Sequence, residues 1–140
     1  MFTFEMAHAL WNYDGKCKNI HGHSYKLFVT LSGTPKNATN DPEDGMILDF
    51  GKFKKIINSS IIEKFDHALV VNANSPHSKL YSAENLPFDK LLKLPFQPTT
   101  ENLLQYFADA IQKVLPDEVK LYRLKLQESD TSYGEWYNTD

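Results

Sequence analysis

An alternating stretch that begins at His21 constrains the fold of this chain more than any other part of the sequence. Its histidine, tyrosine and aliphatic residues recur at every second position, as His21, His23, Tyr25, Leu27, Val29 and Leu31. Successive side chains of a β-strand point to opposite faces, so the pattern predicts a strand over residues 21–32. His21 and His23 would then lie on one face, about 6–7 Å apart. That separation suits two imidazoles binding one metal ion, although such a pair also occurs as two polar side chains on a hydrated face.

A second alternating stretch supplies a possible third ligand. Residues 2–10 predict a first strand that carries His8 near its end. Turn-forming residues fill the segment between the two strands, so we expect neighbouring antiparallel strands that bring His8 beside His21 and His23. Three histidines with an open fourth position are typical of catalytic zinc, because structural zinc sites usually have four protein ligands.

Composition bounds the class of protein. The chain has 140 residues, a net charge of -3 and one cysteine. This length predicts one domain over 1–140. The acidic balance gives no electrostatic reason to bind nucleic acid, and no apolar run approaches the roughly 20 residues of a membrane span. Without a visible signal peptide or a possible internal disulfide, we expect a cytoplasmic protein that binds neither nucleic acid nor membranes.

The middle of the chain predicts a helix. Residues 33–45 have the composition of a loop, and Asp49 is suited to cap a helix over residues 50–64. The expected buried face follows spacings of three and four, through Phe50, Phe53, Ile56, Ile57, Ser60 and Ile61. Asp66 and His67 follow the end of this helix.

The second half predicts one more helix and two more strands. Prolines and asparagines make residues 72–98 irregular, with a short helical turn around 84–93. A helix should follow from Thr99 or Thr100 to about residue 115, before Pro116. Strands are expected over 119–127 and 133–137. The order β-β-α-α-β-β predicts an α+β fold, with an antiparallel sheet and two helices on one of its faces.

Several side chains could perform chemistry beside a metal. Cys17 lies between two lysines, and nearby cations favour the thiolate form that acts as a nucleophile or base; an inert buried thiol is the alternative. Asp66 and His67 could relay protons or simply cap a helix end. Glu128 could be a solvated carboxylate, or could accept two parallel N–H bonds from a guanidine-like heterocycle.

Six short motifs in this order resemble the 6-pyruvoyl-tetrahydropterin synthase superfamily, and most closely its bacterial branch of 6-carboxy-5,6,7,8-tetrahydropterin synthases. The motifs are Phe4-x-x-Ala7-His8, Lys16-Cys17-x-x-x-His21-Gly22-His23-Ser24-Tyr25, Gly45-Met46-Ile47-Leu48-Asp49-Phe50, Phe65-Asp66-His67, Pro98-Thr99-Thr100-Glu101-Asn102 and Glu128-Ser129. The resemblance implies the tunnelling fold, in which trimers close their sheets into a barrel and two trimers stack as a hexamer.

The resemblance also implies roles for individual residues. His8, His21 and His23 would bind Zn2+, and Cys17 would be the general acid/base. Asp66 and His67 would complete its proton relay, usually from a neighbouring subunit. The remaining residues concern the pterin: Glu128 would anchor the ring, and the pocket would be lined by Thr99, Thr100 and Glu101.

The implied reaction converts 7,8-dihydroneopterin triphosphate to 6-carboxy-5,6,7,8-tetrahydropterin in the queuosine pathway, with release of triphosphate and acetaldehyde. The short Cys17-x-x-x-His21 spacing resembles this branch, whereas the animal pyruvoyl enzymes commonly have a longer one. Formation of 6-pyruvoyl-tetrahydropterin is the alternative within the family. A three-histidine zinc hydrolase or hydratase and a non-catalytic metal- or pterin-binding module are alternatives of other classes.

Overall fold

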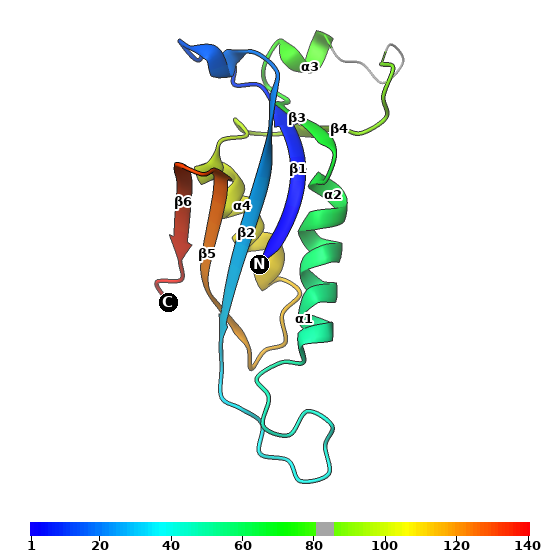
Figure 1. Cartoon of the computed structure of the whole chain (residues 1–140), viewed down its shortest axis with the longest axis vertical. Helices are drawn as coiled ribbons and strands as arrows, with labels where there is room; N and C mark the ends of the chain where they lie inside the picture. Colours follow the sequence, from blue (N-terminus) through cyan, green and yellow to red (C-terminus); the bar gives the residue numbers. More distant parts are fainter. Residues whose placement is uncertain (81–85) are drawn as a thin grey trace.

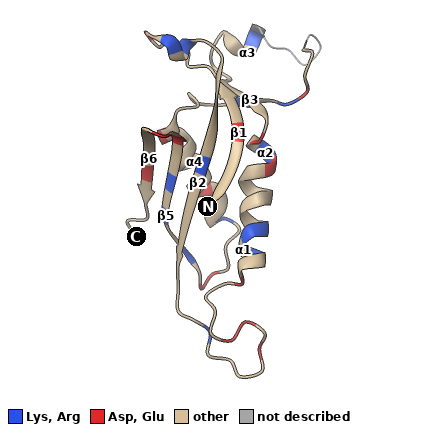
Figure 2. Cartoon of the chain, in the orientation of Figure 1, with Lys and Arg blue, Asp and Glu red and all other residues tan. Residues whose placement is uncertain are grey.

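The computed structural model describes residues 1–80 and 86–140. Within these ranges the strands form one six-stranded sheet in the order β4-β3-β1-β2-β5-β6, and the longer helices cover one of its faces (Figure 1). The α+β class expected from the sequence is therefore confirmed. Acidic and basic residues are interspersed along the strands and helices (Figure 2). None of the helices in these ranges is long and apolar enough to cross a membrane.

The four antiparallel strands lie close to their predicted positions. β1 (Phe2–His8) pairs with β2 (His21–Ser32), and this register places His8 opposite His21. β5 (Lys120–Ser129) continues the sheet beside β2, and β6 (Ser132–Tyr137) follows it at the edge. The predicted hairpin is thus the centre of the fold.

The predicted order β-β-α-α-β-β is wrong because it omits two strands. β3 (Ala68–Asn72) pairs parallel to β1, and β4 (Leu91–Leu94) pairs parallel to β3. Four consecutive residues of β3 are buried, so the strand has no polar alternation that would reveal it in the sequence. The helical turn expected around 84–93 is also wrong where it can be checked. Residues 84 and 85 lie outside the described residues, whereas the rest of the segment is irregular before β4 begins.

The predicted first helix is continuous but not regular throughout. It consists of α1 (Phe50–Ile57), a π-helical stretch η2 (Asn58–Ile62) and α2 (Glu63–Phe65). The hydroxyl groups of Ser59 and Ser60 donate to carbonyls one turn earlier, which competes with the backbone ladder. Phe50 was expected on the buried face but is 78% exposed. The first turn of α1 adjoins the loop that precedes it, so Phe50 lies in an apolar groove there and not over the core.

The core lies between the helices and the sheet. α4 (Thr100–Gln112) begins where predicted and ends three residues before the expected 115. It packs on β5 and β6, and the core joins it to the first helix through aromatic side chains. The largest fully buried side chains of the described residues include Phe4, Tyr25, Phe65, Phe107 and Leu124.

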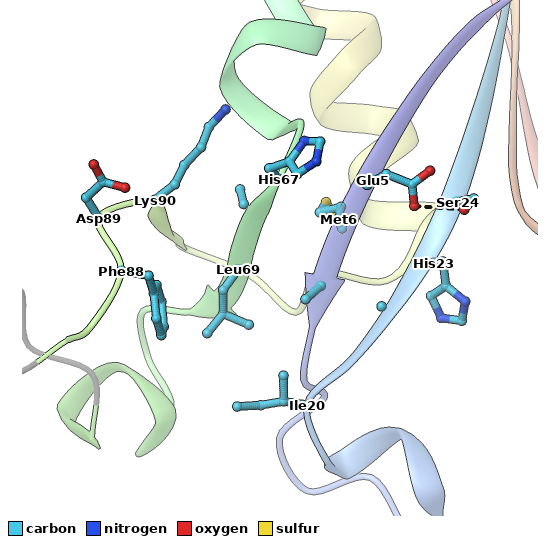
Figure 3. Close-up of a pocket in the computed structure, with 13 residues that line it drawn as sticks. Glu5, Met6, Ile20, His23, Ser24, His67, Leu69, Phe88, Asp89 and Lys90 are labelled. Carbon is cyan, nitrogen blue, oxygen red and sulfur yellow. Dashed lines mark hydrogen bonds between the residues drawn. The ribbon is translucent and has the colours of Figure 1, made fainter.

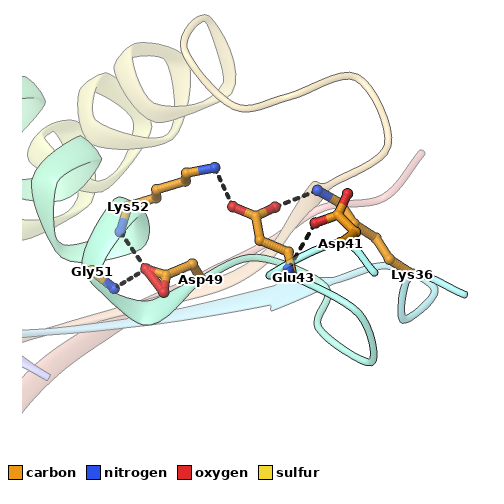
Figure 4. A network of polar contacts seen from close by, with 6 residues as sticks. All are labelled: Lys36, Asp41, Glu43, Asp49, Gly51 and Lys52. Atoms are coloured by element: carbon orange, nitrogen blue, oxygen red, sulfur yellow. Dashed lines mark hydrogen bonds and ion pairs between the residues drawn. The ribbon is translucent and has the colours of Figure 1, made fainter. Parts of the chain in front are cut away.

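Charged side chains fix the loop between β2 and α1. Glu43 is only 8% exposed and forms ion pairs with Lys36 and Lys52 (Figure 4). Asp49 caps α1 as predicted, because its Oδ2 accepts a hydrogen bond of 3.1 Å from the N–H of Lys52 and one of 2.7 Å from the preceding N–H. A polar network therefore holds this loop at the start of the helix.

Replacing Ile111 with alanine should lower the free energy of unfolding by about 2–5 kcal/mol, because its side chain is fully buried against the sheet. Val114→Ala is the matched control: Val114 lies just beyond α4, is 52% exposed, and its truncation should cost no more than about 0.5 kcal/mol. Urea titrations followed by circular dichroism measure both. Equal losses would contradict the placement of the buried face of α4.

Candidate metal centre and adjoining cavity

Three histidine side chains meet at one end of the β1–β2 hairpin. His8 is the last residue of β1, and His21 and His23 open β2, so the pairing of two strands brings the three together. Their candidate ligand nitrogens all lie within 4.8 Å of one another. We call these three residues the histidine cluster. It shares the helix-facing side of the sheet with Tyr25, which is fully buried.

The hydrogen bonds of two of these rings orient them as metal ligands are oriented. His8 Nδ1 lies 2.7 Å from the carbonyl oxygen of Pro98, and His21 Nδ1 lies 2.7 Å from that of Asn19. A carbonyl oxygen only accepts, so each Nδ1 must donate, and in the neutral, metal-binding form of the ring each Nε2 then presents a bare lone pair. The two Nε2 atoms are nevertheless 3.0 Å apart. Two lone pairs at this distance repel each other, whereas a metal ion bound by both would attract them.

The third ring adds an unpaired nitrogen. His23 Nε2 is buried and has no hydrogen-bond partner within the described residues. Buried polar atoms normally have a partner, and binding to the same ion would provide one. Glu128 Oε1 lies 3.4 Å from both His8 Nε2 and His23 Nε2, so a carboxylate adjoins the histidine cluster. The donor set of three imidazoles suits zinc.

Burial prepares His8 to be a ligand. The apolar surroundings disfavour the imidazolium and so lower the pKa of His8 below its usual 6.5. The bond to the Pro98 carbonyl acts in the opposite direction, and the neighbouring His21 adds to the lowering. His8 is therefore neutral near pH 7, which is the form that binds metals.

Glu128 lies on the same face of the sheet as the histidine cluster, because it continues the alternation of the buried Leu124 and Leu126 in β5. Gln127 pairs with Tyr133, but Ser129 pairs with Ser132, so Glu128 is an extra residue in β5. This β-bulge lies between β5 and β6, whereas the regular pairing of β2 with β5 sets Glu128 across from Tyr25. The Glu128 carboxylate accepts a hydrogen bond of 3.3 Å from the hydroxyl group of Tyr25. Burial, followed by the negative charge of Glu128, raises the pKa of Tyr25 far above its usual range, so the phenol keeps the proton that it donates.

A cavity of about 540 Å³ opens beside the histidine cluster. Besides His8, its lining includes five residues that the sequence singled out, namely Cys17, Thr99, Thr100, Glu101 and Glu128. Cys17 belongs to the short helix η1 (Lys16–Lys18), and the threonines belong to the start of α4, where Thr99 is the N-cap. The fold therefore gathers a thiol, a carboxylate and a candidate metal ligand from both ends of the chain.

Asp66 and His67 lie elsewhere, on the face of the sheet that the helices leave open. The N–H of Glu5 donates to Asp66 Oδ1 at 2.9 Å and lowers the pKa of Asp66, and His67 Nδ1 lies 3.0 Å from the same carboxylate oxygen. His67 is 76% exposed and borders a second cavity, of about 580 Å³, which Glu5, Ser24 and His23 also line (Figure 3). Cys17 is not part of that lining. Within one chain, His67 and Cys17 line different cavities.

The groups that orient the ligands were not identified from the sequence. Pro98 and Asn19 contribute main-chain carbonyl oxygens, and residue type carries no signal for such a contact. Tyr25 does continue the alternation of His21 and His23, so its place on their face could be found. Its bond to Glu128 depends on the pairing of β2 with β5, which the alternation does not reveal.

Fold and site together define an α+β protein with a candidate three-histidine metal centre beside a cavity that holds a thiol and a carboxylate. The family model described as 6-pyruvoyl tetrahydropterin synthase matches residues 1–139. The chain belongs to this family, which confirms the resemblance that its motifs indicate.

Relatives carry names from two branches of the family. The chain is 30% identical to a 6-carboxy-5,6,7,8-tetrahydropterin synthase of Haemophilus influenzae, and the match covers 96% of this chain and 94% of the relative. It is 34% identical to the human 6-pyruvoyl tetrahydrobiopterin synthase, over 84% of this chain and 68% of the relative. Among solved structures, a Caenorhabditis elegans 6-pyruvoyl tetrahydropterin synthase has a TM-score of 0.65 at 25% identity, covering 99% of this chain and 91% of that one.

Replacing His23 with alanine should abolish stoichiometric zinc binding, because only two of the three ligand nitrogens would remain. Metal analysis after dialysis against zinc measures the bound ion. His77→Ala is the control, since His77 lies outside the histidine cluster and should leave the stoichiometry unchanged. Tight zinc binding by the His23 variant would refute the three-histidine assignment.

The metal-free protein should lose stability as the pH falls below about 6.5. Folding lowers the pKa of His8, so as the pH falls His8 of the unfolded chain takes up a proton before His8 of the folded protein does. The stability that is present above the unfolded-state pKa is therefore lost as the pH falls toward the folded-state pKa. Urea unfolding with a chelator at about pH 7.5, 6.5 and 5.5 measures this slope. His8→Gln, which does not titrate, should show a shallower slope. The same slope in both proteins would contradict the lowered pKa.

Proposed function

We propose that this protein is a zinc-dependent lyase that converts 7,8-dihydroneopterin triphosphate to 6-carboxy-5,6,7,8-tetrahydropterin for queuosine biosynthesis, with release of triphosphate and acetaldehyde. One observation carries the proposal: His8 of the histidine cluster shares a cavity with Cys17 and Glu128, in a chain of this family. The relatives from Haemophilus influenzae and Aquifex aeolicus, at 30% and 31% identity, are named for this product.

His8, His21 and His23 would hold the zinc ion through their Nε2 atoms. The support is the orientation of His8 and His21 by carbonyl oxygens and the unpaired nitrogen of His23. Three neutral imidazoles leave the charge of the ion uncompensated. Zinc, when bound, supplies Lewis-acid chemistry that makes oxygen-bearing substrate carbons easier to deprotonate.

Cys17 would be the general acid/base. It is half-buried and lines the same cavity as His8, so its sulfur faces the space in which a substrate side chain would lie. A positioned thiol can accept a proton as thiolate and return it to another atom. The flanking Lys16 and Lys18 place positive charge on η1 (Figure 2).

Glu128 would anchor the pterin ring. Its carboxylate can accept two parallel N–H bonds from the guanidine-like edge of a pterin. The hydrogen bond from the hydroxyl group of Tyr25 stabilises the negative charge of this carboxylate. Thr99, Thr100 and Glu101 line the same cavity and would contact the ring. The bulge in β5 and the start of α4 would then form two walls of the pterin pocket.

Asp66 and His67 would complete the proton relay of Cys17 in a neighbouring subunit. The support is their separation, since within one chain Cys17 and His67 border different cavities. We propose a cytoplasmic homohexamer of two stacked trimers, in which the sheets of each trimer close into a barrel. The active sites would lie at the subunit interfaces.

The same site could also support other functions, and these alternatives decide which experiment tests the proposal. The human relative is named for a pyruvoyl product, so 6-pyruvoyl-tetrahydropterin formation is the alternative within the family. The short Cys17-x-x-x-His21 spacing and the match over 94% of the Haemophilus relative favour the carboxy product. A zinc hydrolase would use the histidine cluster without Cys17, and a binding module would not turn over its ligand.

The zinc-loaded protein incubated with 7,8-dihydroneopterin triphosphate should release acetaldehyde and 6-carboxy-5,6,7,8-tetrahydropterin, both identified by mass spectrometry. Formation of a pyruvoyl pterin without acetaldehyde would instead support the alternative within the family.

Cys17→Ala should keep its zinc and lose about 10²-fold or more in kcat, since general acid–base catalysis contributes at least that much. Full activity of this variant would favour the hydrolase.

Glu128→Ala should raise the KM for the pterin substrate and keep its zinc. Loss of zinc would instead make Glu128 a metal ligand.

A further inference from the structure

The side-chain amide of Gln97 forms a two-point contact with the backbone of Trp11. The N–H of Trp11 donates to Gln97 Oε1 at 3.1 Å, and Gln97 Nε2 donates to the carbonyl oxygen of Trp11 at 2.6 Å. One amide thus satisfies both polar groups of a single residue, as a neighbouring strand would. The two residues are 86 positions apart in the chain, so the contact joins two distant segments.

Trp11 begins the segment that carries Cys17. Residues 11–20 follow the end of β1, and all of them except Cys17 are exposed. Burial of apolar surface therefore contributes little to holding this segment in place. Within the described residues, two side chains from outside the segment bond to its backbone: Gln97 bonds to Trp11, and His21 bonds to Asn19. Cys17 lies between these two attachments, and its own carbonyl oxygen accepts a hydrogen bond of 2.9 Å from the N–H of Leu10, the residue before Trp11.

Gln97 is itself fixed on its other side. Its carbonyl oxygen accepts hydrogen bonds from the N–H of Thr99 at 2.8 Å and from Asn102 Nδ2 at 3.0 Å, which tie it to the start of α4. The next carbonyl, that of Pro98, orients His8. A rigid helix start thus holds both a metal-ligand candidate and, through the amide of Gln97, the entry to the Cys17 segment.

We propose that Gln97 is a positioning residue for Cys17. Its amide fixes the backbone at Trp11, so that η1 holds the thiol in the cavity beside the histidine cluster. Gln97 also lines this cavity, but its effect on Cys17 is exerted through the backbone of the segment. The inference rests on the proposed function for the catalytic role of Cys17, but the placement of the thiol can be measured without turnover.

Gln97→Leu tests the inference because it removes both hydrogen bonds at nearly constant side-chain size. Cys17 is the only cysteine, so the rate of alkylation by iodoacetamide reports on this thiol alone. In chelator-treated protein, the variant should be alkylated about tenfold faster across the pH profile, as expected for the loss of two hydrogen bonds. In zinc-loaded protein, kcat should fall about tenfold while KM changes less than about twofold, because Glu128 and the start of α4 are unchanged.

Gln105→Leu is the matched control. Gln105 lies on the exposed side of α4, and its amide bonds to Asp109 on the same helix. This variant should match the wild type in alkylation rate, kcat and KM. Wild-type alkylation and turnover in Gln97→Leu would overturn the inference. A rise in KM without a change in the alkylation rate would do so too, because it would assign Gln97 to the pterin pocket.

Gln97→Glu keeps the test decisive if the leucine variant does not fold. Its carboxylate still accepts from the N–H of Trp11 but places a second oxygen against the Trp11 carbonyl. Alkylation should rise at least threefold, and a wild-type rate would overturn the inference. If the wild-type protein shows no turnover at all, the proposed function fails, whereas the alkylation rates still decide whether Gln97 positions Cys17.

Discussion

The antiparallel register of β1 and β2 is the constraint on which the site depends. It places His8 opposite His21 and puts all three imidazoles on the helix-facing side. Shifting β2 by one residue would turn its histidines to the open face, together with Tyr25 and Leu27. Both of these side chains are fully buried, so the same shift would remove core packing. The hydrophobic core therefore holds the metal-ligand candidates in place.

The start of α4 connects the parts of the site. Pro98 orients His8 through its carbonyl oxygen, Gln97 fixes the segment that carries Cys17, and Thr99 caps the helix at the cavity. The pairing of β5 with β2 places the Glu128 carboxylate within 3.4 Å of His8 and His23. The start of α4 and the end of β5 thus add a main-chain carbonyl and a carboxylate to the three imidazoles of the β1–β2 hairpin.

Periodicity accounts for how much of the fold was predictable. The hairpin, the two long helices and the caps at Asp49 and Thr99 follow from local patterns, and the structure has them close to the expected bounds. β3 was missed because a buried strand lacks polar alternation, and β4 because its four residues, LLKL, are too few to show a period. The exposure of Phe50 was missed because spacing alone does not say where a helix extends beyond the sheet that it covers.

By itself, the sequence determined that His21 and His23 share a face, that His8 ends a neighbouring strand, and that the chain belongs with the pterin synthases. Only the tertiary structure decided that two Nε2 atoms lie 3.0 Å apart, and that His67 and Cys17 line different cavities. The physical reason is the range of the interactions. Alternation and capping act between near neighbours in the chain, whereas lone-pair repulsion, main-chain carbonyl contacts and cavity walls depend on segments that meet only after folding.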